Sequence, residues 1–139
     1  MRFLKLLSVT LAGVALIAAL ALLSVKPCFN GGENYTFFCG DSSKNCREVT
    51  VSGNPALTKL TLAEVCGECT EYKDFDLESY LLKVNGKVIF TETLSDSVNY
   101  YCKADLPYSV NLYGEEINLH VCVRENAIKV ASPIIFGGY

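Results

Sequence analysis

The sequence predicts an α+β domain with an antiparallel sheet of about four to five strands, covered by one or two helices and preceded by an N-terminal hydrophobic helix. Three observations lead to this fold class. Residues 6–25 contain no charged side chain, two later segments have the caps of short helices, and the C-terminal half alternates apolar and polar residues. The 139-residue chain leaves about 110 residues after the apolar run, which is enough for one domain.

Residues 1–25 have the composition of a signal peptide or a single transmembrane anchor. Arg2 and Lys5 precede the apolar run and favour a cytoplasmic N-terminus. Ala19 and Ala21 have the spacing of an A-x-A cleavage site, but residues 22–25 continue the apolar run beyond it. Cleavage and retention therefore both stay open. In either case the rest of the chain is expected outside the cytoplasm, with the membrane as partner of residues 6–25 if they are retained.

Residues 26–33 contain one proline and two glycines and are predicted to be a linker to an extracytoplasmic domain, residues 34–139. The domain is expected to begin with a hairpin. Its strands are residues 35–39 and 46–51, and the polar residues 41–45 form the turn.

The first predicted helix begins at Asn54, a good N-cap residue, with Pro55 in its first turn. Its apolar residues are spaced as on a helix, and Gly67 is expected to end the element. A strand over residues 58–65 is the alternative.

The second predicted helix begins at Asp74 or Asp76 and closes at Asn85-Gly86. The acidic start suits the positive end of a helix dipole. Asn-Gly between apolar runs is also a strong hairpin signal, so two strands are the alternative here.

Alternating residues predict strands in the rest of the chain, at 87–94, 98–104, 109–113, 116–124 and 127–136. In the fourth segment the alternation places His120 on the solvent side, opposite an apolar face. The fifth contains Pro133, which cannot donate a ladder hydrogen bond, so this strand is expected at an edge or with a bulge.

The charge balance argues against a nucleic-acid partner. Without Arg2 and Lys5, ten basic residues face fifteen acidic ones. Nucleic-acid binding depends on basic groups that neutralise phosphates, and the domain has no basic cluster. With a single histidine and no paired-carboxylate pattern, the sequence also offers no catalytic set, and it favours a protein that is not an enzyme.

All seven cysteines follow the apolar run, and cysteines in exported domains of this size usually form disulfides. The candidates for disulfides are Cys39, Cys46, Cys102 and Cys122, with a Cys39–Cys46 bridge closing the first hairpin. The odd number leaves at least one unpaired, and Cys28, beside the membrane, is expected to be that residue.

Cys66-Gly67-Glu68-Cys69 has the spacing of a redox pair, so Cys66 and Cys69 are the candidate reactive thiols. A redox C-x-x-C usually lies between a strand and a helix, whereas this motif is predicted to follow a helix and precede a loop. A structural role is therefore favoured. Together with His120 and Cys122 the motif supplies only half of a zinc pattern, so neither a metal nor another cofactor is expected.

The C-terminal segments 117–124 and 128–135, followed by a final tyrosine, resemble the end of the YwmB-like proteins. These are exported proteins of Gram-positive bacteria with a TATA-box-binding-protein-like fold. The shared pattern is N-L-x-x-x-x-R followed by a P-I-I or P-I-V segment. The resemblance implies antiparallel strands backed by helices and carries no catalytic residue over to this chain.

These observations favour an exported or membrane-anchored extracytoplasmic domain with a binding or structural role and an unknown protein partner. An extracytoplasmic thiol-disulfide or redox-sensing protein that uses Cys66 and Cys69 is the first alternative. A secreted effector or inhibitor held together by disulfides is the second.

Overall fold

The computed structural model describes residues 1–41 and 45–136, so most of the turn predicted at 41–45 and the final tyrosine lie outside the described residues. The class is α+β, as predicted. Three helices are described: α1 (Arg2–Ser24), α2 (Pro55–Thr61) and α3 (Leu77–Lys83). The strands are β1 (Glu33–Cys39), β2 (Arg47–Thr50), β3 (Val65–Tyr72), β4 (Lys87–Thr93), β5 (Val98–Lys103), β6 (Val110–Leu112), β7 (Glu115–Ile117), β8 (Leu119–Val123) and β9 (Ile128–Ser132).

The main sheet is larger than predicted. It has seven strands in the order β2-β1-β3-β9-β8-β5-β4, and every described pair in it is antiparallel. β6 and β7 form a separate two-stranded ribbon. The additional central strand is β3, which covers the C-G-E-C motif. The prediction assigned this segment to a helix end and a loop, because a short cysteine-rich run has little apolar alternation.

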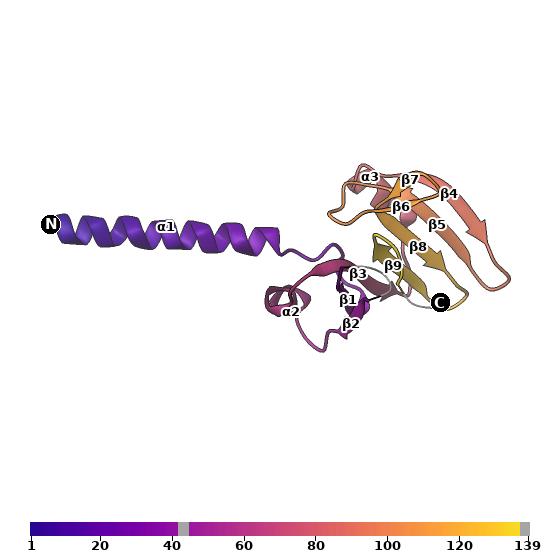
Figure 1. Cartoon of the computed structure of the whole chain (residues 1–139), viewed down its shortest axis with the longest axis horizontal. Coiled ribbons are helices and arrows are strands. Elements are labelled where there is room, and N and C mark those ends of the chain that lie inside the picture. The colour runs from indigo at the N-terminus through magenta and orange to yellow at the C-terminus, as the bar shows by residue number, and fades with distance from the viewer. Residues whose placement is uncertain (42–44, 137–139) are drawn as a thin grey trace.

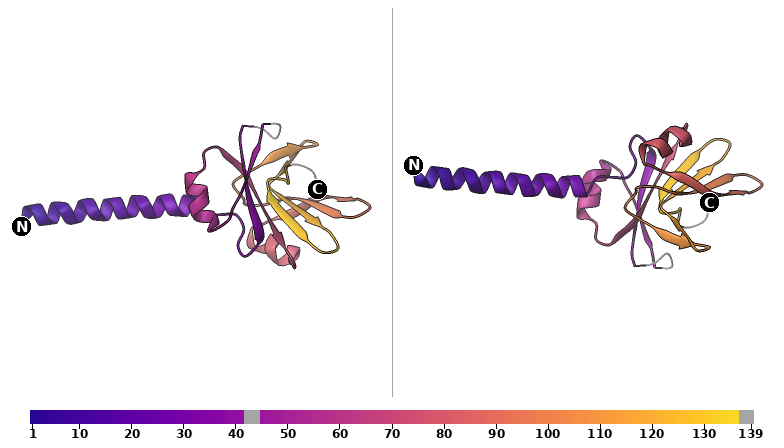
Figure 2. Two further views of the ribbon diagram at one scale, coloured as in Figure 1. Left: turned by 90° about the horizontal axis from the view of Figure 1, so that it is seen from below. Right: turned by 90° about the horizontal axis from the view of Figure 1, so that it is seen from above.

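Helix α1 projects away from the sheet domain, with its N-terminus at the far end (Figure 1). Its 23 residues give a length of about 35 Å, slightly more than the hydrocarbon core of a bilayer. It is long and apolar enough to cross a membrane, and none of that apolar window is buried inside the protein. Both views of Figure 2 place α2 beside the C-terminal end of α1.

Both short helices begin at the predicted caps. The Asn54 side chain accepts a 2.9 Å hydrogen bond from the amide of Ala56, and Pro55 is the first residue of α2. Asp76 caps α3 through the amide of Ser79. Helix α2 ends at Thr61 rather than at Gly67, since the chain enters β3 at Val65.

The predicted first hairpin is confirmed as the pair β1–β2, and the C-terminal strands also form, with two differences. The segment 116–124 is split into β7 and β8 at Asn118, whose side chain donates to the carbonyl of Tyr108 at 3.1 Å. The last strand was predicted to lie at an edge or to contain a bulge, and both alternatives were wrong. β9 is central, between β3 and β8, and Pro133 follows its last residue, so no ladder hydrogen bond is lost.

The two faces of the main sheet differ. We call the face that carries Phe37, Val121 and Val130 the helix-side face, since residues of α3 pack on this cluster. We call the opposite face, with Phe38, Cys69 and Ala131, the tail-side face. There the chain after β9 folds back, and its Ile135 and Phe136 pack against these residues.

Candidate functional site

Residues 26–33, predicted to be a linker, are built into the domain, and Glu33 is already the first residue of β1. Phe29 is 2% exposed in the core of the helix-side face. The amide of Cys28 donates a 2.7 Å hydrogen bond to Oε2 of Glu68. The domain therefore begins within a few residues of the end of α1. Cys28 is half-buried, and its position beside a membrane stays a prediction.

Glu68 is the centre of a buried polar cluster on the helix-side face. Its side chain is fully buried on β3, where neighbouring strands cover it on both sides. Lys59 of α2 forms an ion pair with Oε1, and the Lys59 ammonium also donates to the carbonyl of Lys26 at 3.2 Å. We call Glu68, Lys59, Tyr35 and Tyr108, together with the amide of Cys28, the Glu68 cluster.

Two tyrosines complete the Glu68 cluster. The hydroxyl of Tyr35 donates to Oε2 of Glu68 at 2.6 Å, and that of Tyr108 donates to Oε1 at 3.2 Å. Burial raises the pKa of both tyrosines, and the nearby Glu68 charge raises it further, so both hydroxyls stay protonated as donors. A buried carboxylate is tolerated when it is paired and its oxygens accept hydrogen bonds, and both conditions hold here.

The arrangement of the Glu68 cluster is structural rather than catalytic. Glu68 is 0% and Lys59 9% exposed, and every oxygen of the carboxylate already has partners. A general acid or base needs access to its substrate. What the cluster does is connect α2, β1, β3 and the segment after α1 at one point.

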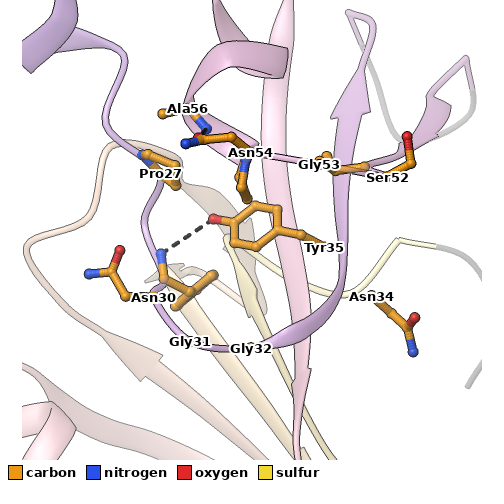
Figure 3. A pocket seen from close by; sticks show the side chains of 13 residues that line it. Pro27, Asn30, Gly31, Gly32, Asn34, Tyr35, Ser52, Gly53, Asn54 and Ala56 are labelled. Carbon is orange, nitrogen blue, oxygen red and sulfur yellow. Dashed lines mark hydrogen bonds between the residues drawn. The ribbon is translucent and has the colours of Figure 1, made fainter.

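A pocket of about 460 Å³ adjoins the Glu68 cluster, between the segment 27–35 and the start of α2 (Figure 3). The ring of Tyr35 lies in it, and its hydroxyl accepts a 3.3 Å hydrogen bond from the amide of Phe29. Among the described residues that line it, none is charged, and Asn30, Asn34, Ser52 and Asn54 supply the polar groups. Such a pocket suits a neutral polar group rather than an ion.

The candidate cysteines are distributed over both faces of the sheet. Cys39 and Cys102 pack in the helix-side cluster, whereas Cys46, Cys66, Cys69 and Cys122 pack on the tail-side face. Cys39 and Cys46 thus pack in different clusters, and so do Cys102 and Cys122. All seven thiols are free in this structure, so the expected disulfides stay predictions.

The C-G-E-C motif lies inside a strand, which changes its chemistry. Residues three apart on a strand have Cα atoms about 10 Å apart, and a disulfide needs less than about 7 Å. Burial raises the pKa of Cys69 to about 12, so this thiol is a poor nucleophile. This position in a strand does not favour a redox pair of Cys66 and Cys69, which stays a prediction, and it buries Glu68 between them with four polar partners.

His120 is buried, not on a solvent-facing side as predicted, because the tail folds over it. Its Nδ1 accepts a 3.2 Å hydrogen bond from the amide of Ile135, and Nε2 lies 3.1 Å from Oδ1 of Asn99. Its ring stacks on Tyr101 with centroids 4.4 Å apart. Burial lowers the pKa of His120 to about 4, which keeps the ring neutral.

Among the described residues, no group of three or more His, Cys, Asp or Glu side chains is arranged to hold a metal ion. No protein-family model, curated protein or solved structure matches this chain. The resemblance of the C-terminal segments to the YwmB-like proteins thus stays a prediction. The sequence did not single out Glu68, because the spacing of Cys66 and Cys69 around it is typical of thiol chemistry. The sequence signal that could have indicated it is an acidic residue in the middle of an eight-residue segment that forms a strand.

Proposed function

We propose that this protein is a membrane-anchored extracytoplasmic domain with a binding or structural role, and that it keeps its N-terminal helix. The observation that carries the proposal is the direct connection between α1 and the Glu68 cluster. α1 ends at Ser24, and Lys26 and Cys28 already bond to Lys59 and Glu68. A retained helix would thus hold the sheet domain close to the bilayer.

The surface of α2 supports this arrangement. Leu57 and Leu60 are 62% and 45% exposed, on a helix that lies beside the end of α1 (Figure 2). Exposed leucines at this end of the domain could insert into the bilayer where the headgroups meet the acyl chains. The binding role is assigned to the uncharged pocket around Tyr35, which lies at the same end because Pro27 lines it. The redox alternative that uses Cys66 with Cys69 has no observation of this kind in its favour.

The test is to express the full chain with a C-terminal tag, separate membrane and soluble fractions, wash the membranes with alkaline carbonate and sequence the N-terminus. We expect washed membranes to retain a protein that starts at Met1. Digestion of the tag by protease added outside the cell would place the domain outside the cytoplasm. Soluble exported protein starting near residue 22 would contradict the retained anchor.

A substitution in α1 sharpens the test. Val14→Asp places a charge at the middle of the helix, which costs about 2.5–3.5 kcal/mol for insertion. We expect this variant to lose membrane retention. Thr10→Ser, which changes neither charge nor helix length, is the matched control and should fractionate as the unchanged chain does.

A further inference from the structure

Three cysteines meet where β1 ends. Cys39 is the last residue of β1 and pairs with Arg47 of β2 on one side and with Val65 of β3 on the other. Cys46 and Cys66 directly adjoin those two partners in sequence. The end of β1 therefore has Cys46 on one flank and Cys66 on the other.

The side chains of these three cysteines point to different faces of the sheet: Cys46 and Cys66 share one face, and Cys39 lies on the other. Cys39 points into the helix-side cluster. The register between β1 and β3 shifts between Phe38 and Cys39, and Cys66 is the extra residue of this bulge. The bulge turns Cys66 to the tail-side face, where it packs with Cys46 against the cluster around Phe38.

Gly40 allows the two flanks to approach each other. Its φ is +149°, and a Cβ on it would lie 2.7 Å from the carbonyl oxygen of Asn45 and 3.3 Å from Cα of Cys46. The backbone at Asn45 and Cys46 therefore packs directly against Gly40 at the end of β1. This packing brings the start of β2 near β3. The thiols of Cys46 and Cys66 consequently hydrogen-bond to each other, and Cys66 Sγ also donates to the carbonyl of Phe38 at 3.3 Å.

We propose that Cys46 and Cys66 are a disulfide site that connects the start of β2 to the bulge of β3, and that neither Cys39 nor Cys69 takes part. Both thiols are half-buried, so a small oxidant can reach them. The proposal is independent of whether α1 is cleaved.

The reaction requires a disulfide oxidant such as oxidised glutathione. The Cys46 thiolate attacks one sulfur of the oxidant, a mixed disulfide forms and the first thiolate leaves. Cys66 then loses its proton and attacks the Cys46 sulfur, which releases the second thiolate. In total two protein thiols lose two electrons and two protons, and the oxidant is reduced to two thiols. Burial raises the pKa of the Cys46 thiol, but its hydrogen bond with Cys66 opposes this rise, so Cys46 is the first nucleophile.

The consequence is a redox-dependent restraint on α2. The bond would close a loop over residues 46–66, which contains β2, α2 and the pocket wall formed by residues 51–56. Lys59 lies inside this loop, and its partner Glu68 lies two residues beyond Cys66. Oxidation would therefore hold α2 on the sheet by a covalent bond in addition to the ion pair.

Tryptic peptides separate the possible pairings. Cleavage at Lys44, Arg47, Lys59 and Lys73 leaves Cys46 in peptide 45–47 and Cys66 with Cys69 in peptide 60–73. Cys28 and Cys39 stay in peptide 6–44, since the bond between Lys26 and Pro27 resists trypsin. The full chain in detergent is treated with oxidised glutathione at mildly alkaline pH, alkylated, digested without reductant and analysed by mass spectrometry.

We expect peptide 45–47 to be linked to peptide 60–73 in the unchanged chain and in the controls Cys39→Ala and Cys69→Ala. The link should be lost in Cys46→Ser and in Cys66→Ser. Oxidation should also raise the melting temperature of the unchanged chain but not that of Cys46→Ser. A link from peptide 45–47 to peptide 6–44 would overturn the proposal, as would complete alkylation of Cys46 and Cys66 after the oxidant has been consumed. The peptide map of the unchanged chain decides the question even if a variant fails to fold.

Discussion

Lys59 and Glu68 form an ion pair inside the protein, with side chains 9% and 0% exposed, and thereby join α2 to the third strand of a seven-stranded sheet. The ammonium group of Lys59 also lies 5.3 Å from the ring centroid of Tyr108. A charge pair in this position contributes to stability only while it is complete, since removing one partner leaves the other buried without compensation.

Glu68→Gln should therefore lower the free energy of unfolding by about 3–5 kcal/mol, because the Lys59 charge stays buried without a counter-charge. The measurement is urea unfolding of the full chain in detergent, followed by circular dichroism. Lys59→Met should cost a similar amount. The double variant should lose less than the sum of the two, as expected for residues in contact.

The surface ion pair between Lys103 and Glu116, with side chains 52% and 50% exposed, is the matched control. Glu116→Gln should cost no more than about 1 kcal/mol, because solvent already screens this pair. Equal losses of unfolding free energy in Glu68→Gln and Glu116→Gln would mean that the Glu68 cluster does not stabilise the fold.

Tyr35→Phe removes a hydroxyl that donates to Glu68 and accepts from the amide of Phe29. Both partners are buried, so we expect a loss of about 1–3 kcal/mol in unfolding free energy. Tyr113→Phe is the control: Tyr113 is 93% exposed, and its change should leave the urea midpoint unaltered. A Tyr35 variant as stable as the unchanged chain would show that the hydroxyl is dispensable.

Gly67, the small residue of the C-G-E-C motif, is predicted to be required by packing. A Cβ there would lie 2.9 Å from the carbonyl oxygen of Ser132 and 3.0 Å from the Phe136 ring. Because the nearer atom belongs to the backbone of β9, Gly67→Ala should cost about 1–3 kcal/mol. Gly53→Ala, with nothing within 4 Å of the added carbon, should change stability by less than about 0.5 kcal/mol. Thermal unfolding of both variants checks this, and similar melting temperatures would contradict it.

Acid should destabilise the protein through His120. Burial lowers the pKa of His120 in the folded state to about 4, while an unfolded histidine titrates near 6.5. The unfolded chain therefore binds more protons between these values. The stabilisation by neutral His120 is complete above pH ~6.5 and is lost as the pH falls towards ~4, and it amounts to about 3 kcal/mol.

The measurement is the unfolding free energy as a function of pH, for the unchanged chain and for His120→Gln, which cannot titrate in this range. Protonation of Nδ1 would remove its hydrogen bond from Ile135, so the tail should be released first. The slope between pH ~4 and ~6.5 should be smaller in the variant. Equal slopes would assign the acid sensitivity to carboxylates instead.

Local signals determined much of the secondary structure. Asn54 and Asp76 cap helices because their side chains accept hydrogen bonds from amides two or three residues on, which is a local property. The hairpin β1–β2 and the strands after residue 86 follow from alternation, and the apolar run of α1 from composition. Each of these features depends on residues close together in the chain, so each could be predicted.

The sequence by itself thus determined an apolar N-terminal helix and an α+β domain with capped helices. Only the tertiary structure decided that β3 and β9 lie side by side in the middle of the sheet, because strand order depends on contacts between distant residues. That order buries Glu68 opposite Lys59, covers His120 with the tail and brings Cys46 to Cys66 across the end of β1. Spacing along the chain cannot show which side chains share a face once a bulge shifts the register. The C-G-E-C motif therefore suggested a pair of Cys66 with Cys69, whereas the fold places Cys66 beside Cys46 and buries Glu68 against Lys59.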